Sequence, residues 1–139
     1  MSADIVTPEH RSSIMSKIRG KNTKPEMLVR SLCHQMGLRF RLHRRDLPGT
    51  PDLVFPKYRL CMFVHGCFWH RHPECKYAYM PKSRVDFWQT KFTKNVERDL
   101  NAQQALIDLG WRVVTIWECH TKNRDLLRVE IQKAFNIEV

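Results

Sequence analysis

The sequence predicts an α/β fold in which helices flank one mixed sheet of four strands. Two segments with helical spacing are followed by three short strand-like segments joined by tight turns, then by a long helical segment, a fourth strand and a last helix. Short turns make the first three strands antiparallel, whereas a helical crossover lets the fourth run parallel to its neighbour. At this length we expect residues 1–139 to form a single domain.

The first two helices are predicted from their start and stop signals. Residues 7–20 begin with Thr-Pro, which favours a helix start, and end with glycine. Thr23 and Glu26 form the capping-box pattern of a second helix, in which the Glu26 carboxylate would reach back to the Thr23 amide. Gly37 ends this helix, and Cys33 lies at core spacing within it.

The three strands are predicted from alternation and from the turns between them. Residues 39–43 alternate between polar and apolar side chains. Residues 52–55 follow the turn cluster at 47–51, and a second turn, Pro-Lys-Tyr, separates them from residues 60–65. The last of these segments is apolar almost throughout, which is typical of a strand buried on both faces.

The long helix is predicted between Ser83 and Gly110. Its apolar residues recur every four positions, at Trp88, Phe92, Val96 and Leu100. Residues 111–117 then form the fourth strand. Residues 123–135 form the last helix, which places four apolar residues on one face: Leu127, Ile131, Ala134 and Phe135.

The chain is strongly basic, with 24 lysines and arginines against 14 acidic residues and a formal net charge of +10. On so small a chain this favours a polyanionic partner, most often nucleic acid. Residues 60–64 form the longest apolar run and are too few to cross a bilayer, and the N-terminal residues lack the apolar core of a secretory signal. We therefore expect a soluble, cytoplasmic protein that does not bind membranes.

The segment HGCFWHRHPEC, residues 65–75, carries candidate metal ligands. Cys67, His72 and Cys75 supply three zinc-type ligands within nine residues, and Cys119 or His120 could supply the fourth. The chain has five cysteines, an odd number, and no export signal, so metal binding is a better account of the cluster than disulfides. We expect a structural zinc site that fixes an irregular loop to the end of the sheet.

Asp52 is a candidate ligand for Mg²⁺, because it stands at the edge of a strand beside a turn. Antiparallel pairing could bring Val64 and His65, at the far end of the next strand, close to it. His65 and His70 could face the same cleft and transfer protons there. Glu26 could also approach this metal through water, although capping alone would explain it.

Several large apolar side chains are candidates for contact with a nucleic acid. Phe68 and Trp69 lie in the loop that zinc would fix, and apolar wedges of this kind enter base steps of a duplex. Trp88, at the start of the long helix, and Met15, in the first helix, could join them. The basic residues are spread along the chain, which suits contact with the phosphate backbone more than base reading.

Four segments of the sequence then resemble, in order, the motifs of the very-short-patch-repair (Vsr) DNA mismatch endonucleases: LPGTPDLVF, MFVHGCFWH, KNVERD and LGWRVVTIWEC. The resemblance runs from about Ser12 to Cys119. It implies a restriction-endonuclease-like core of the PD-(D/E)xK type. It also implies nicking of double-stranded DNA on the 5′ side of the thymine in T·G mispairs, which arise when 5-methylcytosine deaminates and which very short patch repair corrects.

The resemblance also implies roles for individual residues. Asp52 would be the central Mg²⁺ ligand, helped by the backbone carbonyl of Val64. His70 would be the general acid or base, with His65 and Glu26 assisting through metal-bound water. The implied zinc ligands are Cys67, His72, Cys75 and Cys119, and the implied intercalating side chains are Phe68, Trp69, Trp88 and Met15.

The expected cofactors are therefore catalytic Mg²⁺ and structural Zn²⁺, and the expected substrate is double-stranded DNA with a T·G mismatch. We expect a monomer whose residues 1–20 contact DNA, and repair proteins of the MutL type are candidate partners that the sequence leaves open. Two alternatives stand beside this interpretation. One is a restriction-type or other site-specific nuclease on the same core, and the other is a zinc-stabilised DNA-binding module without catalysis.

Overall fold

The computed structural model describes residues 22–135, and these residues contain one four-stranded mixed sheet with helices on both faces. The predicted α/β class and strand number are therefore confirmed. The predicted first helix and Met15 lie outside the described residues. The elements follow one another as α2 (Lys24–Gln35), β1 (Arg41–Leu42), β2 (Leu53–Phe55), η2 (Pro56–Tyr58), β3 (Leu60–His65), α3 (Val85–Asp108), β4 (Arg112–Trp117), η3 (Glu118–Lys122) and α4 (Arg124–Ala134).

The sheet has the predicted connectivity, with the order β1-β2-β3-β4. β1, β2 and β3 form an antiparallel meander in which Leu53 pairs with Met62. β4 returns through α3 and pairs with β3 in parallel, with Val64 opposite Ile116. The carboxyl ends of β3 and β4 therefore meet at the same edge of the sheet.

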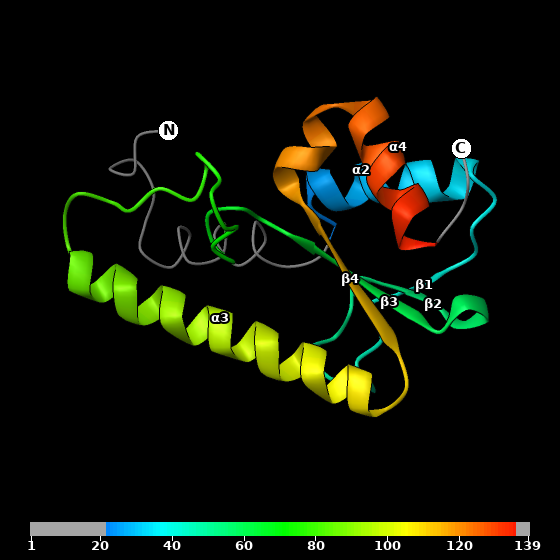
Figure 1. Cartoon of the computed structure of the whole chain (residues 1–139), viewed down its shortest axis with the longest axis horizontal. Coiled ribbons are helices and arrows are strands. Elements are labelled where there is room, and N and C mark those ends of the chain that lie inside the picture. Colours follow the sequence, from blue (N-terminus) through cyan, green and yellow to red (C-terminus); the bar gives the residue numbers. More distant parts are fainter. Residues whose placement is uncertain (1–21, 136–139) are drawn as a thin grey trace.

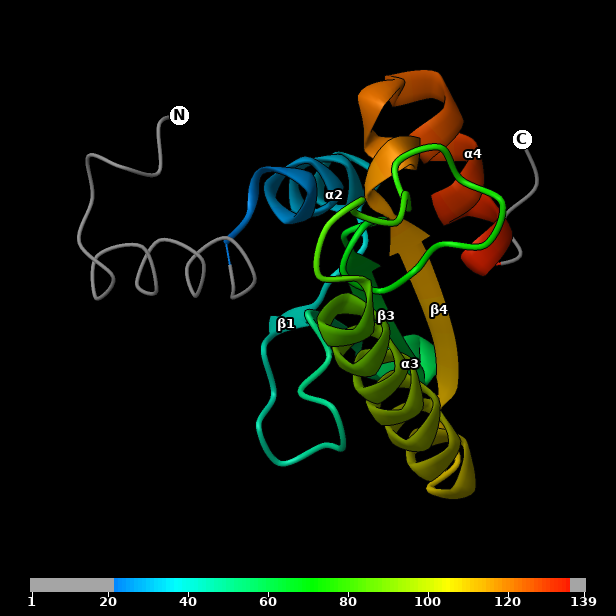
Figure 2. The ribbon, with the colours of Figure 1, turned by 90° about the vertical axis from the view of Figure 1, so that its left-hand side faces the viewer.

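Helices α2 and α4 cover one face of the sheet and α3 crosses the other (Figures 1 and 2). Successive residues of β3 point to opposite faces, so Leu60 and Met62 join the core beneath α2 and α4. Cys61 and Phe63 join the smaller core that includes Leu106 of α3. Both faces of β3 are covered by helices, which explains why its sequence is apolar almost throughout.

Helix α2 begins as predicted, because the Thr23 hydroxyl accepts a hydrogen bond from the Glu26 amide at 3.3 Å. The reciprocal half of the capping box differs from the prediction. The Glu26 carboxylate accepts from the amide of Asn22, not from that of Thr23. Its other oxygen faces His43 and Arg30, so the carboxylate is shared between the helix start and the interior.

Two predicted elements are shorter than expected. β1 spans only Arg41–Leu42, because His43 adopts a left-handed backbone with φ of 46° and ends the alternation. α3 begins at Val85, not at Ser83, because Arg84 before it also has a left-handed backbone, with φ of 55°. The turn predicted at residues 56–58 is a short 3₁₀ helix, η2.

The predicted apolar stripe of α3 is wrong beyond its first turns. Phe92 is buried, but Leu100 is 60% exposed, and the buried positions further along are Asn95 and Leu106. Side chains four apart on an α-helix are about 40° apart around its axis, so a run with that period turns away from the sheet.

No helix within residues 22–135 is long and apolar enough to span a bilayer.

Gly49 sets the turn that leads into β2. Its φ is +74°, and an added Cβ would lie 2.7 Å from Cβ of Ala102 on α3 and 3.2 Å from the Phe63 ring. Gly37 has almost the same φ, +76°, but an added Cβ there would meet nothing within 4 Å. Replacing Gly37 would therefore introduce backbone strain alone, whereas replacing Gly49 would add a steric clash to that strain.

We expect Gly49→Ala to lower the free energy of unfolding by about 1–3 kcal/mol more than Gly37→Ala does, because only Gly49 adds a clash with α3 to the left-handed strain. Urea unfolding of both variants measures the difference. Equal destabilisation would contradict the close packing of this turn on α3.

Candidate active site and metal centre

A cleft of about 360 Å³ opens where β2 begins and β3 ends, beside the middle of α3. Its wall combines five basic or titratable nitrogen side chains with two carboxylates, a composition suited to an anionic ligand that also binds a cation. The lining residues are His43, Arg45, Gly49, Thr50, Asp52, Phe63, Val64, His65, His70, Arg98, Asp99 and Ala102.

Asp52 lies immediately before β2 and points into this cleft. The Val64 amide donates a hydrogen bond to its Oδ2 at 2.7 Å, so the expected approach of these two residues is found. Burial raises the pKa of Asp52 to about 6, against the lowering effect of the Val64 amide, and the nearby Glu26 raises it further. A cation bound beside this buried carboxylate would stabilise its charged form.

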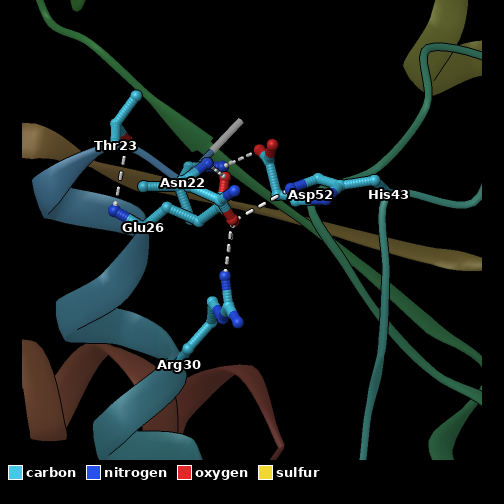
Figure 3. Close-up of polar contacts among 7 residues, drawn as sticks. Asn22, Thr23, Glu26, Arg30, His43 and Asp52 are labelled. Carbon is cyan, nitrogen blue, oxygen red and sulfur yellow. Dashed lines mark hydrogen bonds and ion pairs between the residues drawn. The ribbon is translucent and has the colours of Figure 1, made fainter. Parts of the chain in front are cut away.

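Glu26 and His43 stand next to Asp52 (Figure 3). Glu26 is 1% exposed, and its Oε2 lies 2.9 Å from Nε2 of His43 and 3.5 Å from the guanidinium of Arg30. One ligand atom from each of Glu26, His43 and Asp52 lies within 4.8 Å of the others. Sequence reasoning missed His43, because no motif surrounds it and only the β1–β2 pairing brings it here.

His65 and His70 face the cleft from the end of β3 and the following loop. Their rings are stacked, with centroids 3.8 Å apart and planes 7° from parallel. Nδ1 of His70 lies 2.6 Å from Oδ2 of Asp99 on α3. Burial lowers the pKa of His65 to about 4, and the adjacent His70 adds to the lowering. His65 is therefore neutral at pH 7.

Asp99 is the second residue that sequence reasoning missed. It stands in the segment KNVERD, which the family resemblance marked without giving its members a role. Position 99 lies one full turn from Asn95, a buried amide that donates to the Trp69 carbonyl at 3.2 Å. Polar side chains on the buried face of α3 were the signal that could have found both.

A second group of ligand-type side chains lies beyond the cleft, where the loop after β3 meets the end of β4. Sγ of Cys67 is 3.7 Å and Sγ of Cys119 is 3.5 Å from Nδ1 of His72. Sγ of Cys75 is in the same group, with all four atoms within 4.8 Å of one another. Zinc bonded tetrahedrally at ~2.3 Å to sulfur and ~2.0 Å to nitrogen would set sulfur and nitrogen roughly 3.5 Å apart. The donor set and its spacing fit zinc.

The same group distinguishes Cys119 from His120, the two residues that the sequence left open as the fourth ligand. Among residues 22–135, Cys119 and not His120 joins the Cys67 group. The buried Nδ1 of His120 has no hydrogen-bond partner in the described part of the chain. His72 joins the cysteines, whereas His70 faces Asp99.

The aromatic residues of the loop pack against one another and against α3. The Phe68 ring packs against Trp69, Trp88 and Phe92, with centroids 5.1 to 5.7 Å apart. Trp69 and Trp88 are also neighbours, at 5.9 Å. Phe68, Trp69 and Trp88 are each half-buried. The three predicted wedge residues thus form one aromatic cluster between the loop and the start of α3.

Arg71 fixes this loop, and sequence reasoning gave it no role. Its guanidinium donates to the carbonyls of Phe68, Ala78 and Tyr79 at 3.2, 2.7 and 3.1 Å. It also stacks 3.9 Å from the centre of the Phe92 ring. One side chain thereby joins both arms of the loop to α3.

Comparison with known proteins identifies relatives along nearly the whole chain. The family model described as DNA mismatch endonuclease Vsr matches residues 3–77. The chain is 50% identical to the type II nicking enzyme V.XorIIP of Xanthomonas oryzae pv. oryzae over 133 residues. The aligned residues make up 96% of this chain and 97% of that protein. It is 42% identical over 128 residues to the DNA mismatch endonuclease Vsr of Escherichia coli, covering 92% of this chain and 81% of that protein.

The metal centre can be tested by removing one ligand. We expect purified Cys75→Ser protein to lose most of its bound zinc, because three ligands hold the ion far less tightly than four. Mass-spectrometric metal analysis after dialysis measures this, with Cys33→Ala, a buried cysteine outside the group, as the control that keeps zinc. Undiminished zinc in Cys75→Ser protein would rule out this ligand set.

The buried charge of Asp52 predicts a stability cost that depends on pH. Because its folded pKa is raised from 3.8 to about 6, ionised Asp52 destabilises the fold above pH 6, and the cost fades as the pH falls towards 4. Without added Mg²⁺, we expect Asp52→Asn to raise the free energy of unfolding by roughly 1–3 kcal/mol at pH 7.5 and about half as much at pH 5. Urea unfolding measures both, and a variant that is less stable at both pH values would contradict the argument.

Proposed function

The chain belongs to the Vsr family of DNA mismatch endonucleases, and from this premise we propose that it nicks double-stranded DNA on the 5′ side of the thymine in T·G mispairs. Such a nick would start very short patch repair of deaminated 5-methylcytosine. The observation that carries this proposal is that Asp52 and the His70–Asp99 pair face one basic cleft. A carboxylate for a cation and an oriented imidazole are the two groups that metal-assisted phosphodiester hydrolysis needs.

We infer that Asp52 holds Mg²⁺ in this cleft, with the backbone carbonyl of Val64 as a second ligand and Glu26 contributing through water. Bound there, Mg²⁺ would activate a water molecule and stabilise charge on the scissile phosphate. The Val64 amide holds one Asp52 oxygen at 2.7 Å, which fixes the direction of the carboxylate. Arg45 and Arg98 on the cleft wall would bind flanking phosphates.

His70 would move the proton during hydrolysis. Its contact with Asp99 at 2.6 Å keeps the proton of the neutral ring on Nδ1 and leaves Nε2 for the reacting oxygen. In this state Nε2 would take a proton from the attacking water, and the protonated ring could then give that proton to the leaving oxygen. His65, with its pKa lowered to about 4, is not a proton donor at pH 7 and would instead hold a water molecule and support the stacked ring.

The core of this enzyme would be restriction-endonuclease-like, with a changed second half of the PD-(D/E)xK pattern. Pro51 and Asp52 supply the first half at the start of β2. β3, the next strand, has the sequence LCMFVH and contains neither an acidic residue nor a lysine. We propose that Glu26 from α2 and the histidines after β3 take over those roles.

Zinc and the aromatic cluster would serve DNA recognition. Zn²⁺ held by Cys67, His72, Cys75 and Cys119 would fix the loop that presents Phe68 and Trp69. With Trp88, these rings would enter the duplex beside the mispair, where base steps open at lower cost. Residues 1–20, including Met15, would contact DNA from another side.

We further propose that the enzyme works in the cytoplasm as a monomer, an arrangement supported by a cleft that the described residues of one chain line. Repair proteins of the MutL type would be its candidate partners after nicking. The relatives named type II nicking enzymes suggest the same strand chemistry, one cut in one strand.

A nicking assay tests this proposal. With Mg²⁺, we expect cutting of a T·G duplex and none of the matched duplex, and loss of cutting with retained duplex binding in Asp52→Ala protein. His70→Gln should slow nicking about 10²- to 10⁴-fold, the usual contribution of a general acid or base. Asp125→Asn, at an exposed acid on α4, is the matched control and should cut normally.

Two outcomes would redirect the assignment. Equal cutting of matched and mismatched duplexes would indicate a restriction-type nuclease. Duplex binding by the wild-type chain without any Mg²⁺-dependent cutting would indicate a DNA-binding module.

A further inference from the structure

His43 has no part in the proposed hydrolysis, yet its ring lies close to the carboxylates of both Glu26 and Asp52 (Figure 3). Its side chain is 15% exposed, and it lines the cleft beside Asp52. Its Nε2 lies 2.9 Å from Oε2 of Glu26, whose side chain is 2% exposed. An imidazole placed among buried carboxylates at the mouth of a cleft is a potential metal ligand.

The backbone fixes His43 relative to Asp52. The His43 amide donates to the Asp52 carbonyl at 3.1 Å, one step beyond the pairing of Leu42 with Leu53. The left-handed φ of 46° at His43 turns the chain at this point. The position of the imidazole therefore follows from the β1–β2 ladder and does not depend on a flexible loop.

The spacing of the three side chains fits one ion. Ligands bonded at ~2.1 Å to an octahedral ion are roughly 3.0 Å apart when adjacent and about 4.2 Å apart when opposite. Nε2 of His43 and Oε2 of Glu26 are 2.9 Å apart, the spacing of adjacent ligands. All three ligand atoms, including that of Asp52, lie within 4.8 Å of one another, so small movements would bring them to one ion.

We propose that His43 is a direct nitrogen ligand of the catalytic cation, and that it makes the site prefer transition-series ions such as Mn²⁺ over Mg²⁺. This rests on the proposed function, because it takes Asp52 as the cation site. Mg²⁺ favours oxygen ligands, whereas the transition-series ions accept imidazole. On binding, the ring uses the neutral form with its proton on Nδ1 and exchanges the contact with Glu26 for the ion.

The competing explanation is that His43 only satisfies Glu26 by a hydrogen bond. His43→Gln separates the two, because a glutamine amide can still donate to Glu26 but offers no imidazole nitrogen. His65→Gln and His70→Gln are matched controls, since these rings line the same cleft and are not in the Glu26 group.

The experiment uses the zinc-loaded full chain with Mn²⁺ as the probe. Electron paramagnetic resonance gives the Mn²⁺ affinity, competition with Mg²⁺ gives the preference, and the nitrogen modulation of the bound Mn²⁺ signal reports an imidazole ligand. In the wild-type chain we expect nitrogen modulation and a preference for Mn²⁺. His43→Gln should remove the modulation and reduce the preference at least about tenfold, while the two control variants keep the modulation.

Failure of this inference can be told from failure of the proposed function. If Asp52→Ala abolishes Mn²⁺ binding but the modulation survives His43→Gln, the cation site stands and the role of His43 is overturned. If Mn²⁺ binding is unchanged in Asp52→Ala protein, the proposed cation site is itself wrong, and the inference about His43 falls with it.

Discussion

Both sites depend on the pairing of β3, which lies antiparallel to β2 and parallel to β4. The parallel pairing is the constraint that assembles the Cys67 group. It brings the ends of two strands, reached through the 24-residue helix α3, to one edge of the sheet. At that edge the loop after β3 meets η3, so Cys67 and Cys119 lie together although they are far apart in sequence; the Cys119 amide donates to the Cys67 sulfur at 3.4 Å. The antiparallel pairing of β2 with β3 sets Val64 beside Asp52, and His65, the last residue of β3, lines the cleft.

Burying this site carries an electrostatic cost that the fold offsets only in part. Within the described residues the Glu26 carboxylate has three partners, the Asn22 amide, Arg30 and His43. Among residues 22–135, the Asp52 carboxylate accepts one backbone hydrogen bond, from Val64, and its pKa is raised, so it is the less satisfied of the two carboxylates. A cation at Asp52 would remove this imbalance, which is the pattern expected where a fold exchanges stability for function.

Much of the architecture could be predicted, because strand signals and turns are local. The meander, the crossover and β3 itself follow from short runs and tight turns, and β3 has the predicted bounds. The buried face of α3 was predicted wrongly, because it carries Asn95 and Asp99, polar residues that a search for apolar periodicity passes over. His43 was missed for a related reason, since its place in the site comes from strand pairing and not from any motif.

Side chains of residues 65–75, at the end of β3 and in the loop after it, enter three different environments. The amides of His70 and His72 donate to the carbonyls of Gly66 and Cys67, so the chain winds tightly and sends successive side chains in different directions. His70 then faces Asp99, His72 faces the cysteines, and Phe68 turns to the aromatic cluster. Arg71 joins the two arms of the loop through the carbonyls of Phe68, Ala78 and Tyr79. The group of Cys67, His72, Cys75 and Cys119 joins the loop to η3, and Arg71 packs it on α3. These two contacts on different elements keep His70 and the aromatic rings in a set relation to the cleft.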